Sequence, residues 1–232
     1  MIRYKRKMLF DSESYIFDLD NTLYSYNTNF FDLQLERMSI FIQNLVGINR
    51  LKANDIRDQY YKDFGTTMQG LIKNYGIEAK HFLDFIDDIS LEKLSPNNDL
   101  INLMKKLIAG KKRLYVFTNS SLRHAYRVIK KLGLSNMFDK IVTLECSGLV
   151  PKPKTPSFSN FLNTCSLNPQ KSTFFEDSFF NLVPAKKLGM KTVLVESEID
   201  AIKNFENNIE IDYLVKDVIS YFQGKFISFR KN

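Results

Sequence analysis

Tryptophan is absent from this chain of 232 residues, and only two cysteines are present, Cys146 and Cys165. Two isolated cysteines give neither a framework of disulfides nor the spacing of metal ligands. No apolar run approaches the roughly 18 residues of a membrane span. The apolar stretch after the basic N-terminus, residues 8–10, is too short for the hydrophobic region of a signal peptide. These absences favour a cytoplasmic protein that does not enter a membrane and whose cysteines are ordinary thiols.

Repeats, low-complexity tracts and linkers rich in Pro or Gly are also absent. A chain of this length can bury a large core, either as one domain or as a domain with an insertion. The net charge of +7 suggests nucleic acid as one partner. The basic groups are scattered, however, and most lie near the ends of helical patterns, where cations complement the helix dipole. An anionic small substrate suits the charge equally well, so nucleic acid is the less favoured partner.

Five short segments have the length and composition of buried strands, namely residues 14–18, 113–118, 140–143, 172–176 and 191–195. Helical spacers separate them, which implies crossover connections and a parallel sheet. We therefore expect an α/β fold with a Rossmann-like, doubly wound parallel sheet. In such sheets ligands bind at the carboxyl ends of the strands.

The stretch between the first two strands is helical throughout. Apolar residues repeat every three or four positions and predict one apolar helix face, formed by Phe31, Leu35, Met38, Ile42 and Leu45. A second helix is expected to start at residue 54 or 55 and to end near 64–65, and a third runs from 66–67 to 76. A helix over residues 97–109 returns to the sheet. We therefore expect an all-helical cap, residues 26–94, placed as a lid over a core formed by residues 1–25 and 95–232.

Two carboxylates, Asp18 and Asp20, end the first strand. Burying like charges side by side is costly, so paired acids at a strand end need a reason. Their side chains start on opposite faces of the strand and can serve one site only if the backbone leaves the extended conformation just after Asp18. Such a pair suits a carboxylate nucleophile and its general acid, brought together by a divalent cation. The alternative is a turn in which both acids cap backbone groups.

Polar residues also follow two other expected strands, at Thr118-Asn119 and at Glu176-Asp177, and a loop carries Pro151-Lys152-Pro153. Together with the aspartate pair, these motifs resemble those of the haloacid dehalogenase superfamily of phosphohydrolases. The resemblance extends over about residues 15–218. Matches in the cap at residues 61–67 and 70–71 make the chain look like the pyrimidine 5'-nucleotidase subfamily.

The resemblance implies a role for each acid. Asp18 is the expected nucleophile, which forms an aspartyl-phosphate, and Asp20 is the expected acid–base residue, with a pKa raised by burial. Magnesium is the expected cofactor, held by Asp18, Asp177, the backbone carbonyl of Asp20, and Glu176 either directly or through an intervening group. Asn181 stands where the wider superfamily has a second aspartate, which puts its role in doubt.

The phosphate is expected to contact the backbone of Leu19, the Thr118 hydroxyl, the Asn119 amide and the Lys152 ammonium group. Thr118 could instead cap the next helix. The resemblance gives Lys152 a catalytic role, in which it bridges the Asp18 carboxylate and the phosphate. Lys154 is a nearby rival, but the match of Val150-Pro151-Lys152-Pro153 favours Lys152. Residues that could face the leaving group are Tyr24, Tyr60, Tyr61, Thr66 and Thr67, although tyrosines packed between cap helices fit the pattern as well. Of the two histidines, His124 is expected to be a helix residue rather than a catalyst, and His81 to belong to the cap surface or core.

The expected function is Mg²⁺-dependent hydrolysis of a small phosphorylated metabolite, most simply a pyrimidine nucleoside 5'-monophosphate. Two alternatives stay open. One is a phosphatase for another metabolite, such as a sugar phosphate or phosphoglycolate. The other is a catalytically silent binding module with the same fold.

Overall fold

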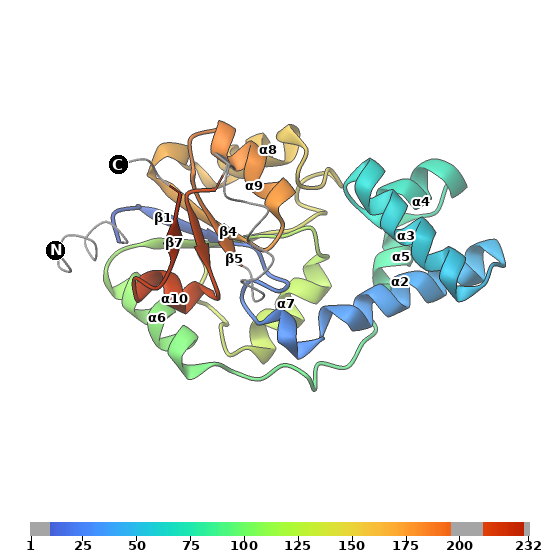
Figure 1. Ribbon diagram of the computed structural model, residues 1–232, viewed down its shortest axis with the longest axis horizontal. Coiled ribbons are helices and arrows are strands. Elements are labelled where there is room, and N and C mark those ends of the chain that lie inside the picture. The colour runs from blue at the N-terminus through green and yellow to red at the C-terminus, as the bar shows by residue number, and fades with distance from the viewer. Residues whose placement is uncertain (1–9, 196–210, 230–232) are drawn as a thin grey trace. The chain divides into compact units, whose positions relative to one another are not determined.

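The computed structural model describes residues 10–195 and 211–229 (Figure 1). The chain divides into two compact units. One comprises the residues up to Asn27 and from Ser95 onward, and the other comprises Thr28–Leu94. The first unit contains a sheet with helices on both faces, whereas the second is entirely helical among its described elements. No helix in the described part of the chain is both long and apolar enough to cross a membrane.

The sheet of the first unit has seven strands among the described residues, in the order β3-β2-β1-β4-β5-β6-β7. Neighbouring strands are parallel except β6 and β7, which are antiparallel. The strands are β1 (Ser14–Phe17), β2 (Arg113–Phe117), β3 (Lys140–Val142), β4 (Ser172–Glu176), β5 (Lys191–Val195), β6 (Tyr213–Val215) and β7 (Ile227–Ser228). The expected α/β fold and its five strands are confirmed. Strands β6 and β7, at one edge of the sheet, were not expected from the sequence.

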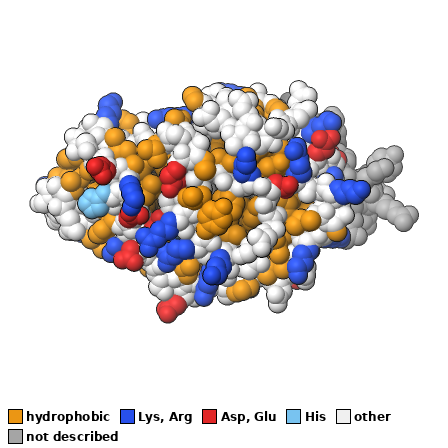
Figure 2. Space-filling model, turned by 180° about the vertical axis from the view of Figure 1, so that it is seen from behind, with side chains coloured by type: hydrophobic (Ala, Val, Ile, Leu, Met, Phe, Trp, Pro, Cys, Tyr) orange, Lys and Arg blue, Asp and Glu red, His pale blue; other side chains and the backbone are white. Residues whose placement is uncertain are grey.

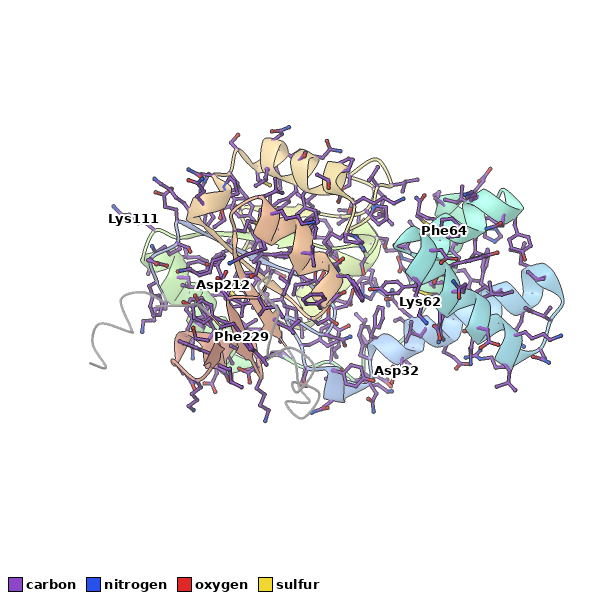
Figure 3. The ribbon with its side chains drawn as sticks, turned by 45° about the horizontal axis from the view of Figure 1, so that its top comes forward. Asp32, Lys62, Phe64, Lys111, Asp212 and Phe229 are labelled. Carbon is purple, nitrogen blue, oxygen red and sulfur yellow. The ribbon has the colours of Figure 1, made fainter. Side chains whose placement is uncertain are left out.

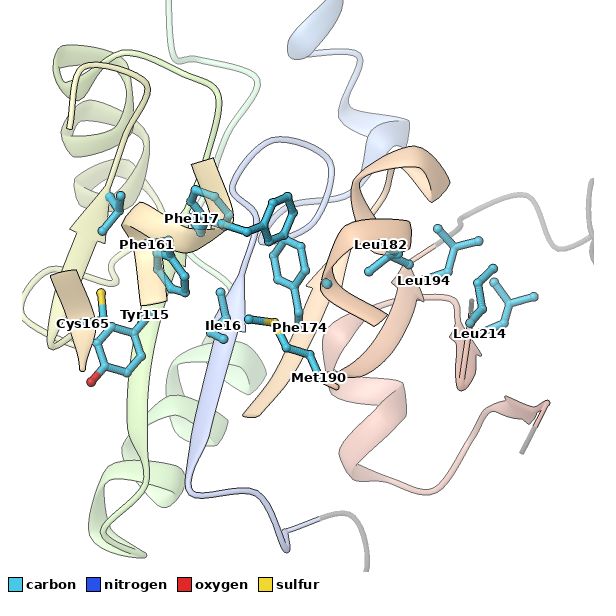
Figure 4. Close-up of a cluster of buried hydrophobic side chains, with 14 residues drawn as sticks. Ile16, Tyr115, Phe117, Phe161, Cys165, Phe174, Leu182, Met190, Leu194 and Leu214 are labelled. Carbon is cyan, nitrogen blue, oxygen red and sulfur yellow. The ribbon is translucent and has the colours of Figure 1, made fainter. Parts of the chain in front are cut away.

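Among the described residues, five α-helices accompany the sheet, namely α6 (Asn98–Ala109), α7 (Leu122–Lys131), α8 (Thr155–Cys165), α9 (Phe179–Lys187) and α10 (Val218–Phe222). The pair α8 and α9 lies on one face, and α6 and α10 lie on the other (Figure 1). Successive strand residues point to opposite faces, so both faces are apolar and buried. On the α8 face Phe117 stacks on Phe161, with ring centroids 4.4 Å apart (Figure 4). On the α10 face Phe175 meets Tyr221 at 5.1 Å.

Polar groups inside this unit are paired where strands begin and end. The Asp212 carboxylate, labelled in Figure 3, accepts a hydrogen bond from the backbone N–H of Thr192 at 2.9 Å, and it accepts another from Lys186 Nζ at 2.6 Å. Helix α7 begins at Leu122, because the Ser121 side chain supplies its N-terminal cap. Such pairing keeps buried backbone donors satisfied at the sheet edges.

The second unit consists of four helices among its described residues, α2 (Phe31–Val46), α3 (Arg50–Phe64), α4 (Thr67–Tyr75) and α5 (Ala79–Ile86). Its interior is aromatic, and the Phe41 ring contacts Phe82 and Phe85 at 5.1 and 5.5 Å. Helix α3 starts at Arg50, so the expected start at residue 54 or 55 is wrong. Asn49 caps the helix earlier by accepting the Lys52 N–H at 3.0 Å.

The buried side of α2 also differs from the expected apolar face. Its buried residues are Gln34, Ser39, Phe41 and Ile42, whereas Leu45 is 40% exposed. Gln34 is accommodated inside because its Nε2 donates to Asp87 Oδ1 at 3.1 Å. The periodicity therefore predicted the helix, but polar pairing in the tertiary structure decided which side faces inward.

Candidate active site

The chain turns sharply where β1 ends. The Asp18 N–H still continues the sheet by donating to the Phe175 carbonyl at 2.9 Å. The carbonyl of the following residue, Leu19, accepts the Leu23 N–H at 3.0 Å and so closes a turn. Asn21 adopts a left-handed conformation with φ of 60°, which asparagine tolerates better than most residues. Extension is therefore broken directly after Asp18, as a shared site for both aspartates requires.

Lys152 lies at the centre of the carboxyl edge of the sheet. Its Nζ donates to Asp18 Oδ1 at 2.6 Å, to Glu176 Oε2 at 2.7 Å and to the Phe117 carbonyl at 2.8 Å. An ammonium group has three N–H donors, and all three are used here. Lys152 is 1% exposed, whereas Lys154 is exposed. The structure thus places Lys152, and not its rival, against the aspartate at the end of β1.

Three carboxylates gather at this site, two of them in contact with Lys152. Asp18, Glu176 and Asp177 each place one oxygen within 4.8 Å of the others. Burial, with the charge of Glu176 nearby, raises the pKa of Asp18 to about 8 and raises the pKa of Asp177 well above its ordinary value. Two buried acids and the half-buried Asp177 cluster beside one ammonium group, so when ionised the cluster carries excess negative charge that a divalent cation would balance. An all-oxygen donor set of this kind fits Mg²⁺.

The acids of this cluster are held differently. Both Glu176 oxygens already accept hydrogen bonds, one from Lys152 and the other from the Ser178 N–H at 3.1 Å. Asp177 accepts the Asn21 amide at 3.3 Å. Asn181 is buried in the first turn of α9, and the three Lys152 donors go to other acceptors. Both Glu176 oxygens are thus engaged by protein donors, and the roles of Glu176 and Asp177 as metal ligands stay predictions.

Asp20 faces a different set of partners. Its Oδ1 accepts the Tyr24 hydroxyl at 2.7 Å and lies 2.9 Å from His124 Nε2, while its Oδ2 accepts the Ser120 hydroxyl. Burial acts to raise the pKa of Asp20, but His124, Ser120 and Tyr24 stabilise the carboxylate and bring the pKa below its ordinary value. The expected raised pKa is wrong for this arrangement, because donors from elsewhere in the fold outweigh desolvation.

Two of these partners, Ser120 and His124, were not expected at the site. They lie four residues apart just after β2, a spacing that can place two side chains on the same side at a helix start. Tyr24 belongs to the sheet unit and is buried, and burial together with the Asp20 charge raises its pKa. Its hydroxyl therefore acts as a donor to Asp20 in this structure.

Asn119 makes a two-bond bridge to the lysine loop. Its Oδ1 accepts the Lys152 N–H at 2.8 Å, and its Nδ2 donates to the Lys152 carbonyl at 3.0 Å. Thr118 is buried at the end of β2, where its Oγ1 accepts the Ser120 N–H at 3.0 Å. Ser121, rather than Thr118, caps the N-terminus of α7. Phosphate contacts of Thr118, Asn119 and Leu19 stay predictions.

The remaining candidates lie in the helical unit. Thr66 caps α4 by accepting the Gln69 N–H at 3.2 Å, and buried Thr67 donates to the Arg57 carbonyl at 3.0 Å. Tyr60 packs edge-on against Phe64, a residue labelled in Figure 3, at 5.7 Å between ring centroids. Tyr61 is 47% exposed and is the most open of these four candidates.

Surface charge shows no single basic block on the face drawn in Figure 2. Lys and Arg side chains stand at several separate places there, with Asp and Glu between them. Phosphate-backbone binding needs clustered cations, so this face gives no support to nucleic-acid binding.

A family model described as "Haloacid dehalogenase-like hydrolase" matches residues 15–195, most of the chain. The chain belongs to this family. The expected superfamily is therefore confirmed, and the narrower pyrimidine 5'-nucleotidase assignment stays a prediction.

Two curated members resemble this haloacid dehalogenase-like hydrolase along most of its length. "Phosphate metabolism protein 8" of Saccharomyces cerevisiae is 31% identical over 231 residues, a match covering 88% of this chain and 70% of that protein. "Glyceraldehyde 3-phosphate phosphatase" of Methanocaldococcus jannaschii is 25% identical over 224 residues, covering 88% and 92%. Among solved structures, the HAD-hydrolase YfnB of Bacillus subtilis, bound to magnesium, shares the fold with a TM-score of 0.60 at 17% identity, over 92% of this chain and 98% of that one.

Proposed function

We propose that this hydrolase cleaves phosphate monoesters through an aspartyl-phosphate on Asp18, with Mg²⁺ as cofactor. The observation that carries the proposal is the bridge from Lys152 Nζ to Asp18 and Glu176, at 2.6 and 2.7 Å. It joins residues 134 positions apart in the sequence into one buried, charged site. Phosphoryl transfer depends on positioning and charge neutralisation, which such a site supplies.

The residues support a two-step reaction. A carboxylate oxygen of Asp18 attacks phosphorus, while the bond to the leaving oxygen breaks and Asp20 supplies its proton. Asp20 takes up this proton once the substrate is bound, because the negative charge of the phosphoryl group beside it raises its pKa above the low value of the substrate-free protein. Asp20 then takes a proton from the water that attacks the acyl phosphate, which releases inorganic phosphate and restores Asp18. The Lys152 ammonium group, with the Thr118 hydroxyl and the Asn119 amide that follow β2, stabilises the negative charge on the phosphoryl oxygens. Asp18 and Asp177 would hold Mg²⁺, which would supply further positive charge to balance the charge that develops during the reaction.

The proposed substrate is a nucleoside 5'-monophosphate, with pyrimidine bases preferred. The helical unit is proposed to bind the leaving group. The proposed compartment is the cytoplasm. Support comes from the motif resemblance of residues 61–67 and from the exposed ring of Tyr61, which could stack on a base. A sugar phosphate is the second candidate, favoured by the similarity to glyceraldehyde 3-phosphate phosphatase.

A substrate panel tests this proposal. The purified protein is assayed with Mg²⁺ on UMP, CMP, AMP, glyceraldehyde 3-phosphate, other sugar phosphates and phosphoglycolate, by release of inorganic phosphate. Preferred turnover of UMP or CMP is the expected result. Turnover confined to compounds without a base would reject the nucleotide assignment, and no turnover of any ester would reject the enzyme in favour of a silent binding module.

The variant Asp18→Asn provides the blank for this assay. We expect it to lose activity by on the order of 10⁴-fold or more, because the nucleophile is removed. Its stability should not fall much, because Lys152 keeps its bond to Glu176 and asparagine fills nearly the same space as aspartate. Phosphate release and urea unfolding measure the two effects. Activity within tenfold of the wild type would show that Asp18 is not the nucleophile.

A further inference from the structure

His124 is held firmly inside the first unit. Its side chain is fully buried on α7. Its backbone N–H donates to the Ser121 side chain at 3.0 Å, which caps the helix at this point. A buried imidazole is costly unless its ring nitrogens find partners, and here Nε2 lies 2.9 Å from Asp20 Oδ1. The ring therefore occupies a defined position and points at a carboxylate.

Asp20 is contacted by one residue that is near in the sequence and by two that are distant. Tyr24 is only four residues away and belongs to the same turn. Ser120 and His124 are 100 and 104 residues away, and they reach opposite oxygens of the carboxylate. Contacts on both oxygens restrict rotation of the carboxyl plane, and the two distant ones fix it relative to the sheet and α7.

We infer that His124 is a positioning residue for acid–base catalysis, which aims the Asp20 carboxyl group at the leaving oxygen through its contact with Oδ1. The inference rests on the proposed phosphatase reaction and adds a residue to it. Proton transfer requires the acid within about 2.6–3.2 Å of the accepting atom, so a carboxyl free to rotate spends less time in a productive orientation.

A purely structural role for His124 makes a different prediction. If the ring only fills the interior, its replacement lowers activity on every substrate by the same factor. If it positions the general acid, the loss grows with the need of the leaving group for a proton. An alkoxide leaves poorly without protonation, whereas 4-nitrophenolate is a stable anion and departs almost unaided.

The experiment compares His124→Leu, His124→Gln and the wild type, with Mg²⁺, on a series of substituted phenyl phosphates and one alkyl phosphate. His124→Leu removes the ring nitrogens at similar volume. A glutamine amide can present an N–H near the place of Nε2, so it should restore part of the loss. Ile129→Val, a buried change further along α7, is the matched control for a mildly weakened helix.

In His124→Leu we expect kcat/KM to fall about 10- to 100-fold for the alkyl ester and less than about threefold for 4-nitrophenyl phosphate. The slope of log kcat/KM against leaving-group pKa then becomes more negative, with His124→Gln in between and Ile129→Val on the wild-type line. An equal loss on all esters, or an unchanged slope, overturns the inference while the proposed function stands. A wild type inactive on every ester overturns the proposed function, and the inference falls with it.

Discussion

At the scale of single residues, buried charge decides how this site is built. Lys152 is surrounded by acids that would repel one another without it. Removing one partner from a buried charge cluster is costly, because the charges left behind have lost both water and their counter-ion. The same lysine is therefore expected to be important for stability as well as for catalysis.

The variant Lys152→Met should lower the free energy of unfolding by about 3–5 kcal/mol without Mg²⁺, and it should abolish detectable turnover. Lys154→Met is the matched control, because this neighbouring lysine is exposed, and its effect should stay within about 0.5 kcal/mol. Urea unfolding and phosphate release measure both. Equal effects of the two substitutions would contradict the placement of Lys152 in the buried cluster.

At the scale of elements, the helical unit depends on one close approach. Helices α3 and α4 meet where Gly70 faces Tyr60, and a Cβ built on Gly70 would lie 2.3 Å from Tyr60 Cγ and 2.5 Å from its Cβ. These atoms lie near the tyrosine backbone, so the ring cannot simply swing aside. The contact explains why a helix interior that would favour alanine carries glycine instead.

Gly70→Ala should therefore destabilise the helical unit by about 1–3 kcal/mol, since overpacking outweighs the gain in helix propensity. Gly110→Ala, at the end of α6, is the control. A Cβ there would lie 3.3 Å from the Leu107 carbonyl oxygen and the φ of Gly110 is −78°, so the stability should change by less than about 0.5 kcal/mol. The thermal unfolding temperatures of the two variants, compared with that of the wild type, test both expectations. A Gly70→Ala protein as stable as the wild type would contradict this close packing of α3 on α4.

At the scale of the whole molecule, pH, metal and folding are linked through the acids at the sheet edge. The pKa of Asp18 rises from 3.8 to about 8 on folding, and that of Asp177 also rises. Between about pH 4 and pH 8 the folded protein holds a proton that the unfolded chain has released, so stability falls as pH increases. The lowered pKa of Asp20 acts in the opposite direction but only at acidic pH, below this window.

Without Mg²⁺, the thermal unfolding temperature should therefore fall by a few degrees between pH 5 and pH 8. Magnesium binds ionised carboxylates, so it competes with these protons and should raise the unfolding temperature more at pH 8 than at pH 5. Scanning calorimetry with Mg²⁺ or with a chelator measures both effects, and Asp18→Asn should flatten the dependence on pH. An equal Mg²⁺ effect at the two pH values would speak against an acidic metal site.

The sequence by itself determined the alternation of strands and helices, the five main strands, the helical insertion and the motif residues that end β1, β2 and β4. Local pattern is sufficient there, because strand length, apolar periodicity and capping act over a few neighbouring residues. Only the tertiary structure decided which side of α2 is buried, and that His124 and Ser120 contact Asp20. These outcomes depend on pairing buried polar groups that lie far apart in the chain, and no local pattern records that pairing.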